Sequence, residues 1–161
     1  MDADIVKHLS KLGVVEENRS ITFGVDSGAA ATVIPSGRFA DYPLEDNELS
    51  KIGQGYRSAD GGFVPDQGTR RLLGTIQGRK GAIVKGISAH VAPVSKALMS
   101  VSDMVKAGHV VQFGPHRSFC KHMGTGDEID FVHKNGVYEL TMEVKDYAAA
   151  ASAFGRQAGR P

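Results

Sequence analysis

The sequence predicts a mostly β fold, and two observations carry that prediction. The chain contains 20 glycines and no tryptophan, a composition suited to many tight turns. Its apolar residues fall in short runs rich in β-branched and aromatic side chains, which are typical of strands. With 161 residues the chain is long enough for one domain with a single core and too short for two well-packed lobes.

The first elements expected along the chain are a helix and two strands. Residues 3–13 place apolar side chains at helical spacing, so an N-terminal helical extension is expected over residues 1–17. Strands are expected at residues 20–25 and 31–35, followed by a polar loop over residues 36–51.

The middle of the chain predicts a hairpin and a short helix. Ala59-Asp60-Gly61-Gly62 is a strong turn signal between two strands in residues 52–76, because glycine adopts positive φ at no steric cost. A helix is expected within residues 97–108, capped by Ser100 or Ser102 and ended by Gly108. Further strands and a last hairpin are expected at residues 72–76, 80–89, 110–113 and 118–142. The tail over residues 148–161 is of low complexity and is expected to be disordered.

Charge and cysteine content narrow the class of protein. The 19 basic and 18 acidic residues give a net charge of +1, which indicates neither a nucleic-acid partner nor a membrane surface. A single cysteine excludes an intrachain disulfide and fits a reducing compartment. No apolar stretch approaches a transmembrane span, and residues 1–15 lack the apolar core of a signal peptide. We therefore expect a cytoplasmic protein.

One acidic residue stands inside an apolar run, in Gly24-Val25-Asp26-Ser27-Gly28-Ala29-Ala30-Ala31-Thr32-Val33-Ile34-Pro35. The run predicts a buried strand, a turn at Asp26, and a second strand that Pro35 ends. A carboxylate between two core strands is costly to ionise unless it is heavily hydrogen-bonded, so Asp26 is a candidate catalytic residue. The alternative is an Asx turn at a strand end, the usual role of Asp-Ser-Gly on its own.

Four segments together resemble one family. Asp26 to Ile34 resembles the active-site loop of retropepsin-like aspartic proteases, which is Asp-Ser/Thr-Gly-Ala followed by Thr and two aliphatic residues. Residues 56–68, with Ala59-Asp60-Gly61, look like the flap region of proteases from copia-type LTR retrotransposons. Residues 91–113 resemble the Leu-Leu-Ser-Val segment of the same polyproteins together with its downstream neighbours, and residues 135–140 resemble their Gly-Leu-Tyr-x-Leu segment. The resemblance covers roughly residues 18–142, in the family's order.

The resemblance implies a fold and an assembly. The fold is a closed β-barrel protomer with one or two short helices over residues 18–147, with a C-terminal hairpin extension from about residue 114. Only one Asp-Ser-Gly triplet occurs in the chain, whereas aspartic proteolysis needs two carboxylates that share a proton around one water. The second carboxylate must then come from a second copy, which predicts a C2 homodimer. The sequence leaves the dimer interface open.

The chain also departs from the family pattern. Met99-Ser100-Val101 stands where many retropepsins carry Ile/Leu-Gly-Arg, so the packing beneath the active-site loop is expected to differ. Thr32-Val33-Ile34 is closer to the retroviral form than to the copia form, which often has a histidine there.

The family pattern assigns roles to single residues. Asp26 is the catalytic carboxylate; Ser27 hydrogen-bonds across the two-fold axis; Gly28 lets a backbone N–H approach the carboxylate, where a Cβ would intrude. Ala29 keeps the rim of the substrate cleft small, and Thr32 is expected to make a structural hydrogen bond. Asp60, Gly61 and Gly62 form the tip of a flap that closes on an extended peptide, with no catalytic duty for the Asp60 carboxylate. The alternative for the loop and for the flap is ordinary turn sequence.

A histidine-rich segment near the single cysteine raises the question of zinc. His116, Cys120 and His122 do not have the spacing of a structural zinc site, so neither a metal nor a cofactor is expected. Cys120 is expected to be a buried strand residue.

The function implied by the resemblance is an aspartic endopeptidase that cleaves extended segments of a retrotransposon Gag–Pol polyprotein. Its partners would be a second copy of itself and the polypeptide substrate, within the cytoplasm or virus-like particles, with no direct contact to nucleic acid or membrane. Two alternatives stay open: a catalytically silent dimerisation or peptide-binding module of the same fold, and a zinc-dependent or otherwise unrelated β-domain with a chance Asp-Ser-Gly.

Overall fold

The computed structural model describes residues 18–158, and the expected N-terminal helix lies outside this range. The described chain is mostly β, with three short helices. In chain order the elements are β1 (Ser20–Asp26), β2 (Val33–Pro35), α2 (Glu48–Lys51), β3 (Gly55–Arg57), β4 (Phe63–Pro65), β5 (Gly68–Gly78), β6 (Gly81–Ala92), β7 (Ala97–Ser100), α3 (Val101–Lys106), β8 (His109–Gln112), β9 (Phe119–His122), β10 (Glu128–Asp130), β11 (Val132–Lys134), β12 (Val137–Val144) and α4 (Tyr147–Ala158).

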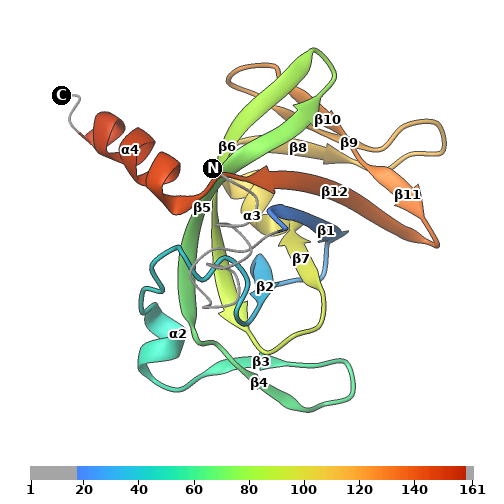
Figure 1. The fold of residues 1–161 in the computed structure, drawn as a ribbon. Coiled ribbons are helices and arrows are strands. Elements are labelled where there is room, and N and C mark those ends of the chain that lie inside the picture. Colours follow the sequence, from blue (N-terminus) through green and yellow to red (C-terminus); the bar gives the residue numbers. More distant parts are fainter. Residues whose placement is uncertain (1–17, 159–161) are drawn as a thin grey trace.

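Six strands close into a barrel (Figure 1). Their order is β1-β7-β2-β6-β5-β12, and β12 returns to pair with β1. Most pairs are antiparallel, whereas β1 and β7 are parallel, as are β2 and β6. β11 extends the sheet beyond β12, so its second edge pairs with no strand among the described residues. The expected mostly β fold with a closed barrel is confirmed.

Strand alternation explains how β1 fills the barrel. Ile21, Phe23 and Val25 are buried, whereas the residues between them are exposed or half-buried. Because successive side chains point to opposite faces of a strand, Gly24 and Asp26 lie on the face away from the core. The same core contains further large side chains from the other strands and from the loop after β2: Ile34, Phe39, Tyr42, Leu72, Val91, Leu140 and Met142.

Two small sheets lie at opposite ends of the molecule (Figure 1). The β3–β4 hairpin is the one predicted around Ala59-Asp60-Gly61-Gly62, and it lies at one end. Strands β8, β9 and β10 form a three-stranded sheet at the other end. The single last hairpin expected over residues 118–142 is therefore wrong: the segment forms one hairpin with β9 and β10 and a second with β11 and β12.

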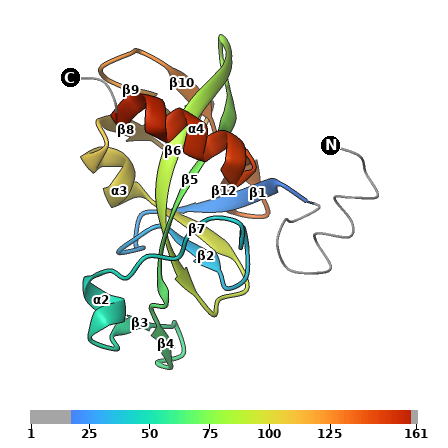
Figure 2. The same cartoon turned by 60° about the vertical axis from the view of Figure 1, so that its left-hand side comes forward.

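The C-terminal segment is a helix, and the expectation of a disordered tail is wrong for residues 148–158. Ala150 is fully buried, and the Tyr147 ring packs edge-on against Tyr42 with a centroid distance of 5.3 Å. The Arg71 guanidinium lies over the Phe154 ring at 5.0 Å. Figure 2 shows α4 crossing the long β5–β6 ribbon. The alanines carry high helix propensity, and the aromatic side chains dock the helix on the barrel.

The loop expected over residues 36–51 also ends in a short helix. Asn47 caps α2, because its side-chain oxygen accepts from the amides of Leu49 and Ser50 at 2.9 Å each. None of the described helices is long and apolar enough to cross a bilayer.

Candidate active site

β1 brings Asp26 to the outer face of the barrel at the start of a tight turn. Asp26 is half-buried, and Ser27 and Gly28 are exposed. The Asp26 Oδ1 accepts a hydrogen bond from the Gly28 amide at 2.8 Å, which is an Asx turn. No other hydrogen bond joins the Asp26 carboxylate to the described residues, so these residues occupy one of its acceptor sites.

Gly28 is not required by crowding from the carboxylate. A Cβ at Gly28 would lie 3.4 Å from Asp26 Oδ1, an ordinary contact distance, and Gly28 does not adopt a positive φ. The expected intrusion of a side chain on Asp26 is therefore absent within one protomer.

A partly buried hydrogen-bond network holds the Asp26 loop from below. The Thr32 amide donates to Asp103 Oδ2 at 2.8 Å, and Thr32 Oγ1 accepts from the Ser100 amide at 3.1 Å. Ser100 Oγ donates to the Ala29 carbonyl at 2.9 Å and accepts from the Asp103 amide at 3.1 Å. Thr32 has the structural role expected for it, but its hydrogen bonds reach the distant Ser100 and Asp103, whereas a local bond was expected. Of the two expected caps of α3, Ser100 is the one observed.

The network explains what Met99-Ser100-Val101 does in this chain. Ser100 pairs with Asp26 in the parallel β1–β7 register and is fully buried. One hydroxyl both caps α3 and holds the loop carbonyl of Ala29, so the end of β7 and the turn after β1 are a single unit. The positioning role of Asp103 was not predicted, because nothing in the local sequence pairs it with Thr32, 71 positions away.

The β3–β4 hairpin has the local geometry of a closed turn. The Ser58 amide donates to the Gly62 carbonyl at 2.8 Å, and Gly61 has a φ of +87°, which only glycine adopts without strain. The exposed Asp60 carboxylate accepts from the Ser58 hydroxyl and from the Gly62 amide. These two hydrogen bonds keep the pKa of Asp60 below its usual value, and the bond from Ser58 has the larger effect. Asp60 thus serves its own turn, and no hydrogen bond within the described residues joins this hairpin to the Asp26 loop.

A second carboxylate, Asp66, holds the base of the same hairpin. Its side chain is fully buried. Oδ2 accepts from the Tyr56 hydroxyl at 2.6 Å and lies 2.5 Å from His90 Nδ1, while Oδ1 accepts from Asn47 Nδ2 and the Gly68 amide at 2.9 Å each. Burial alone would raise the pKa of Asp66, but these hydrogen bonds outweigh it and the pKa is lowered. Burial raises the pKa of Tyr56, and the hydrogen bond that Tyr56 donates to Asp66 raises it further by a smaller amount.

The Asp66 cluster was missed by sequence reasoning. Pro65-Asp66-Gln67-Gly68 signals a turn, and it does form one, since Asp66 Oδ1 accepts from the Gly68 amide. The partners Asn47, Tyr56 and His90 come from three other elements, and no local pattern connects them.

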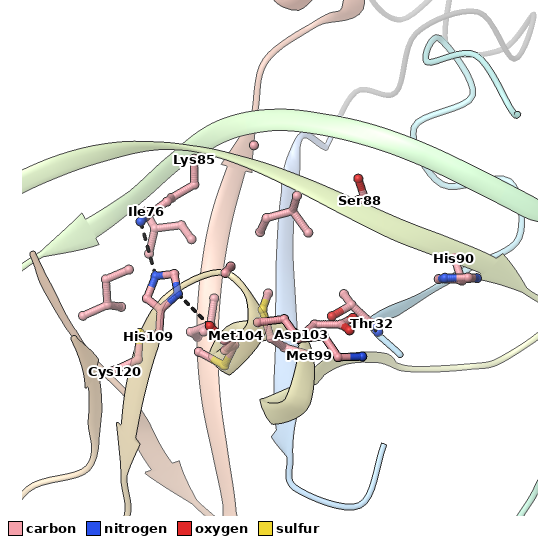
Figure 3. Close-up of a pocket in the computed structure, with 16 residues that line it drawn as sticks. Thr32, Ile76, Lys85, Ser88, His90, Met99, Asp103, Met104, His109 and Cys120 are labelled. Carbon is pink, nitrogen blue, oxygen red and sulfur yellow. Dashed lines mark hydrogen bonds between the residues drawn. The ribbon is translucent and has the colours of Figure 1, made fainter. Parts of the chain in front are cut away.

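A cavity of about 490 Å³ lies behind the loop network (Figure 3). Thr32, Asp103 and His90 line one end, and Lys85, His109 and Cys120 line the other. His109 is held at both ring nitrogens, 3.0 Å from the Met104 carbonyl and 3.3 Å from Lys85 Nζ. Burial lowers the pKa of His109 and raises that of Cys120. Asp26 is not among the residues that line this cavity.

The histidines and the cysteine do not assemble a metal centre in the part of the chain that the structure describes, where no group of three or more His, Cys, Asp or Glu side chains is placed to hold an ion. Cys120 is a buried residue of β9, as expected.

Comparison with known proteins adds no assignment, since no family model, curated protein or solved structure matches this chain.

Proposed function

We propose that the chain is an aspartic endopeptidase whose catalytic dyad is Asp26 and the Asp26 of a second copy. The observation that carries the proposal is the state of the Asp26 turn. A partly buried network holds the loop, yet the carboxylate itself has a single partner, the Gly28 amide, among the described residues. The fully buried Asp66 satisfies both oxygens within the chain, whereas Asp26 is half-buried and its Oδ2 accepts from no described residue, so a second carboxyl group can approach it.

The chemistry follows from two carboxylates about 3 Å apart, which do not both ionise. The ionised carboxylate takes a proton from a water molecule, and the water oxygen attacks the scissile carbonyl carbon. The protonated carboxyl gives its proton to the carbonyl oxygen, which produces a neutral gem-diol. In the collapse, the carboxyl that took the water proton donates it to the amide nitrogen, and the other carboxylate removes a proton from a gem-diol hydroxyl. The C–N bond breaks, an acid and an amine are released, and the dyad again holds one proton. Each Asp26 is thus acid in one step and base in another.

The remaining predicted residues would hold the substrate and the loops. Ser27 is exposed beside Asp26, where its hydroxyl can bond across the two-fold axis. The β3–β4 hairpin would act as the flap, adding its backbone bonds to an extended peptide as a strand adds to a sheet edge. The family resemblance makes the Gag–Pol precursor of a copia-type retrotransposon the expected substrate.

The test is cleavage of a pooled peptide library at pH 4 to 7 over a range of protein concentrations. The wild-type chain is compared with Asp26→Asn and with Asp46→Asn, which removes an exposed carboxylate outside the Asp26 loop and the β3–β4 hairpin. We expect cleavage that rises faster than linearly with concentration, disappears in Asp26→Asn, persists in Asp46→Asn and is blocked by pepstatin. An inactive wild-type chain shown to be dimeric would instead favour the silent module, and equal activity in Asp26→Asn would reject the proposal.

A further inference from the structure

We infer that the β11–β12 hairpin forms the surface on which two copies of this chain meet. The inference rests on the proposed function, because it starts from the requirement that two Asp26 carboxylates share a proton. It adds what that requirement leaves open, namely which part of the chain forms the contact.

The first step is the position of the two-fold axis. Carboxylates that share a proton lie about 3 Å apart, so the axis passes within about 2 Å of the Asp26 oxygens. Any group on the same face within about 10 Å of Asp26 must then lie close to the second copy. Gly24 and Asp26 define that face, since they point away from the core side of β1.

The second step is that the hairpin lies on this face. Gly24 pairs with Glu139 in the antiparallel β1–β12 register, and Phe23 pairs with Leu140. A side chain at Gly24 would meet Val137 Cγ1 at 3.7 Å and Leu98 Cδ2 at 3.5 Å. Val137 therefore lies beside Gly24, and Gly24 is about 7 Å from Asp26 along β1. β11 follows on the far side of β12, about 10 Å from β1.

The third step is the chemistry of the hairpin. Val132 is 63% exposed and Val137 is 47% exposed, although both occupy strands of the main sheet. Their register partners are Glu139 and Lys134, so all four side chains share the face that carries Gly24. The outer edge of β11 pairs with no strand in the described chain, and the end of the hairpin extends beyond the barrel (Figure 1).

The fourth step identifies the occupant. An interface about a two-fold axis places the same patch on both sides, so it must complement itself. The apolar Val132 and Val137 meet that condition, and Lys134 and Glu139 supply opposite charges that form no ion pair within the described residues. A second copy would bury the two valines, pair the two charges and cover the strand edge at once.

The experiment is sedimentation velocity on the full chain over a range of concentrations, with peptidase activity measured on the same samples. Val132→Asp and Val137→Asp place a charge in the proposed contact, and Val84→Asp is the matched control on an exposed position of β6. We expect each hairpin variant to raise the dimer dissociation constant by at least about tenfold, and the control to match the wild type. Near-wild-type circular dichroism would show that the barrel is intact in each variant.

A second measurement does not depend on destabilising the contact. Val132→Cys should be cross-linked into a covalent dimer by a bismaleimide whose spacer spans about 20 Å, twice the distance from β1 to β11, whereas Val84→Cys should not, and the native Cys120 is buried. Dimerisation unaffected by the hairpin variants, or weakened equally by Val84→Asp, would overturn the interface and leave the proposed peptidase standing. A chain that stays monomeric at every concentration would overturn both the interface and the proposed dyad, because half a dyad cannot perform the reaction.

Discussion

Asp26 and Asp66 are both aspartates in tight turns at the ends of strands, and they differ in how their oxygens are used. Each accepts from the amide two residues ahead, at 2.8 Å for Asp26 and 2.9 Å for Asp66. Asp66 then gains Tyr56, His90 and Asn47 as partners and is fully buried, whereas Asp26 gains no further partner in the described protomer and is half-exposed.

The difference separates structure from function in physical terms. A buried carboxylate with four partners stabilises the fold because removing it would strand several polar groups away from water. A carboxylate with one backbone partner contributes little to folding and keeps acceptor sites for a water molecule or a second carboxyl group. The same turn motif thus serves stability at Asp66, and we propose that it serves catalysis at Asp26.

Asp26→Asn gives the largest expected contrast between activity and stability. We expect peptidase activity to fall by about 10³-fold or more, because an amide neither accepts nor delivers the proton. The free energy of unfolding should change by no more than about 0.5 kcal/mol, since the Gly28 amide still finds an oxygen acceptor. Steady-state kinetics and urea unfolding of the same preparation measure both quantities. A large loss of stability would place Asp26 with Asp66 as a structural residue.

Asp66→Asn is the reverse experiment. We expect a loss of about 3 kcal/mol in unfolding free energy, because the amide cannot accept from Tyr56, His90 and Asn47 together. Asp60→Asn on the exposed turn of the same hairpin is the control and should stay within about 0.5 kcal/mol of the wild type. Urea unfolding monitored by circular dichroism compares the three proteins. Equal stability of Asp66→Asn and Asp60→Asn would contradict the role assigned to the buried cluster.

The two aspartates also show how far the sequence could be interpreted. The apolar run around Asp26 and the glycines after Asp60 are local signals, and they predicted β1, β2 and the β3–β4 hairpin correctly. Ser100 and Ser102 were the two expected caps of α3, because capping depends on neighbouring residues, and Ser100 is the cap.

Contacts between distant elements left no such signal. Asp66 meets Asn47 and His90, 19 and 24 positions away, and Thr32 meets Asp103 across 71 positions. α4 was misjudged for the same reason, because its order depends on Tyr42 and Arg71 of the barrel rather than on its own alanine-rich composition. The turn at Asp26 was predictable from neighbouring residues, and the hydrogen bonds from distant residues that hold this turn in place were not.

Thr32→Val tests whether the network below Asp26 positions the loop. The valine keeps the shape of threonine but leaves the buried Ser100 amide without its acceptor, so we expect a loss of about 1–3 kcal/mol in stability. If the proposed function holds, kcat should fall more than KM rises, because the loop carries the reacting group. Ser102→Ala, an exposed serine two positions after Ser100, is the control for both measurements. A variant with lowered stability and unchanged kcat would limit the network to a folding role.

The dependence of the unfolding free energy on acidic pH is a further test of the role of Asp66. Because the pKa of Asp66 is lower in the folded state than in the unfolded chain, its ionised form adds stability above about pH 4. That contribution disappears as the pH falls through the folded-state pKa, when protonation breaks the cluster. Unfolding free energies measured from pH 7 to pH 2 should therefore fall less steeply below pH 4 in Asp66→Asn than in the wild type. Identical slopes in the two proteins would show that Asp66 is not a source of the acid sensitivity.

The smallest expected effect concerns the charges beside the hairpin valines, and it rests on the inferred interface. Glu139→Lys and Lys134→Glu each place like charges on both copies at the rim, so we expect each single variant to weaken dimerisation by about two- to fivefold, the range of an exposed ion pair. The double variant exchanges the two charges and should recover most of the wild-type affinity, because a self-complementary patch remains self-complementary when both signs are reversed. Sedimentation at low and high salt measures the effect, which should shrink as salt screens the rim. Losses that add in the double variant would mean that Lys134 and Glu139 do not face each other across the axis, even if the valines do.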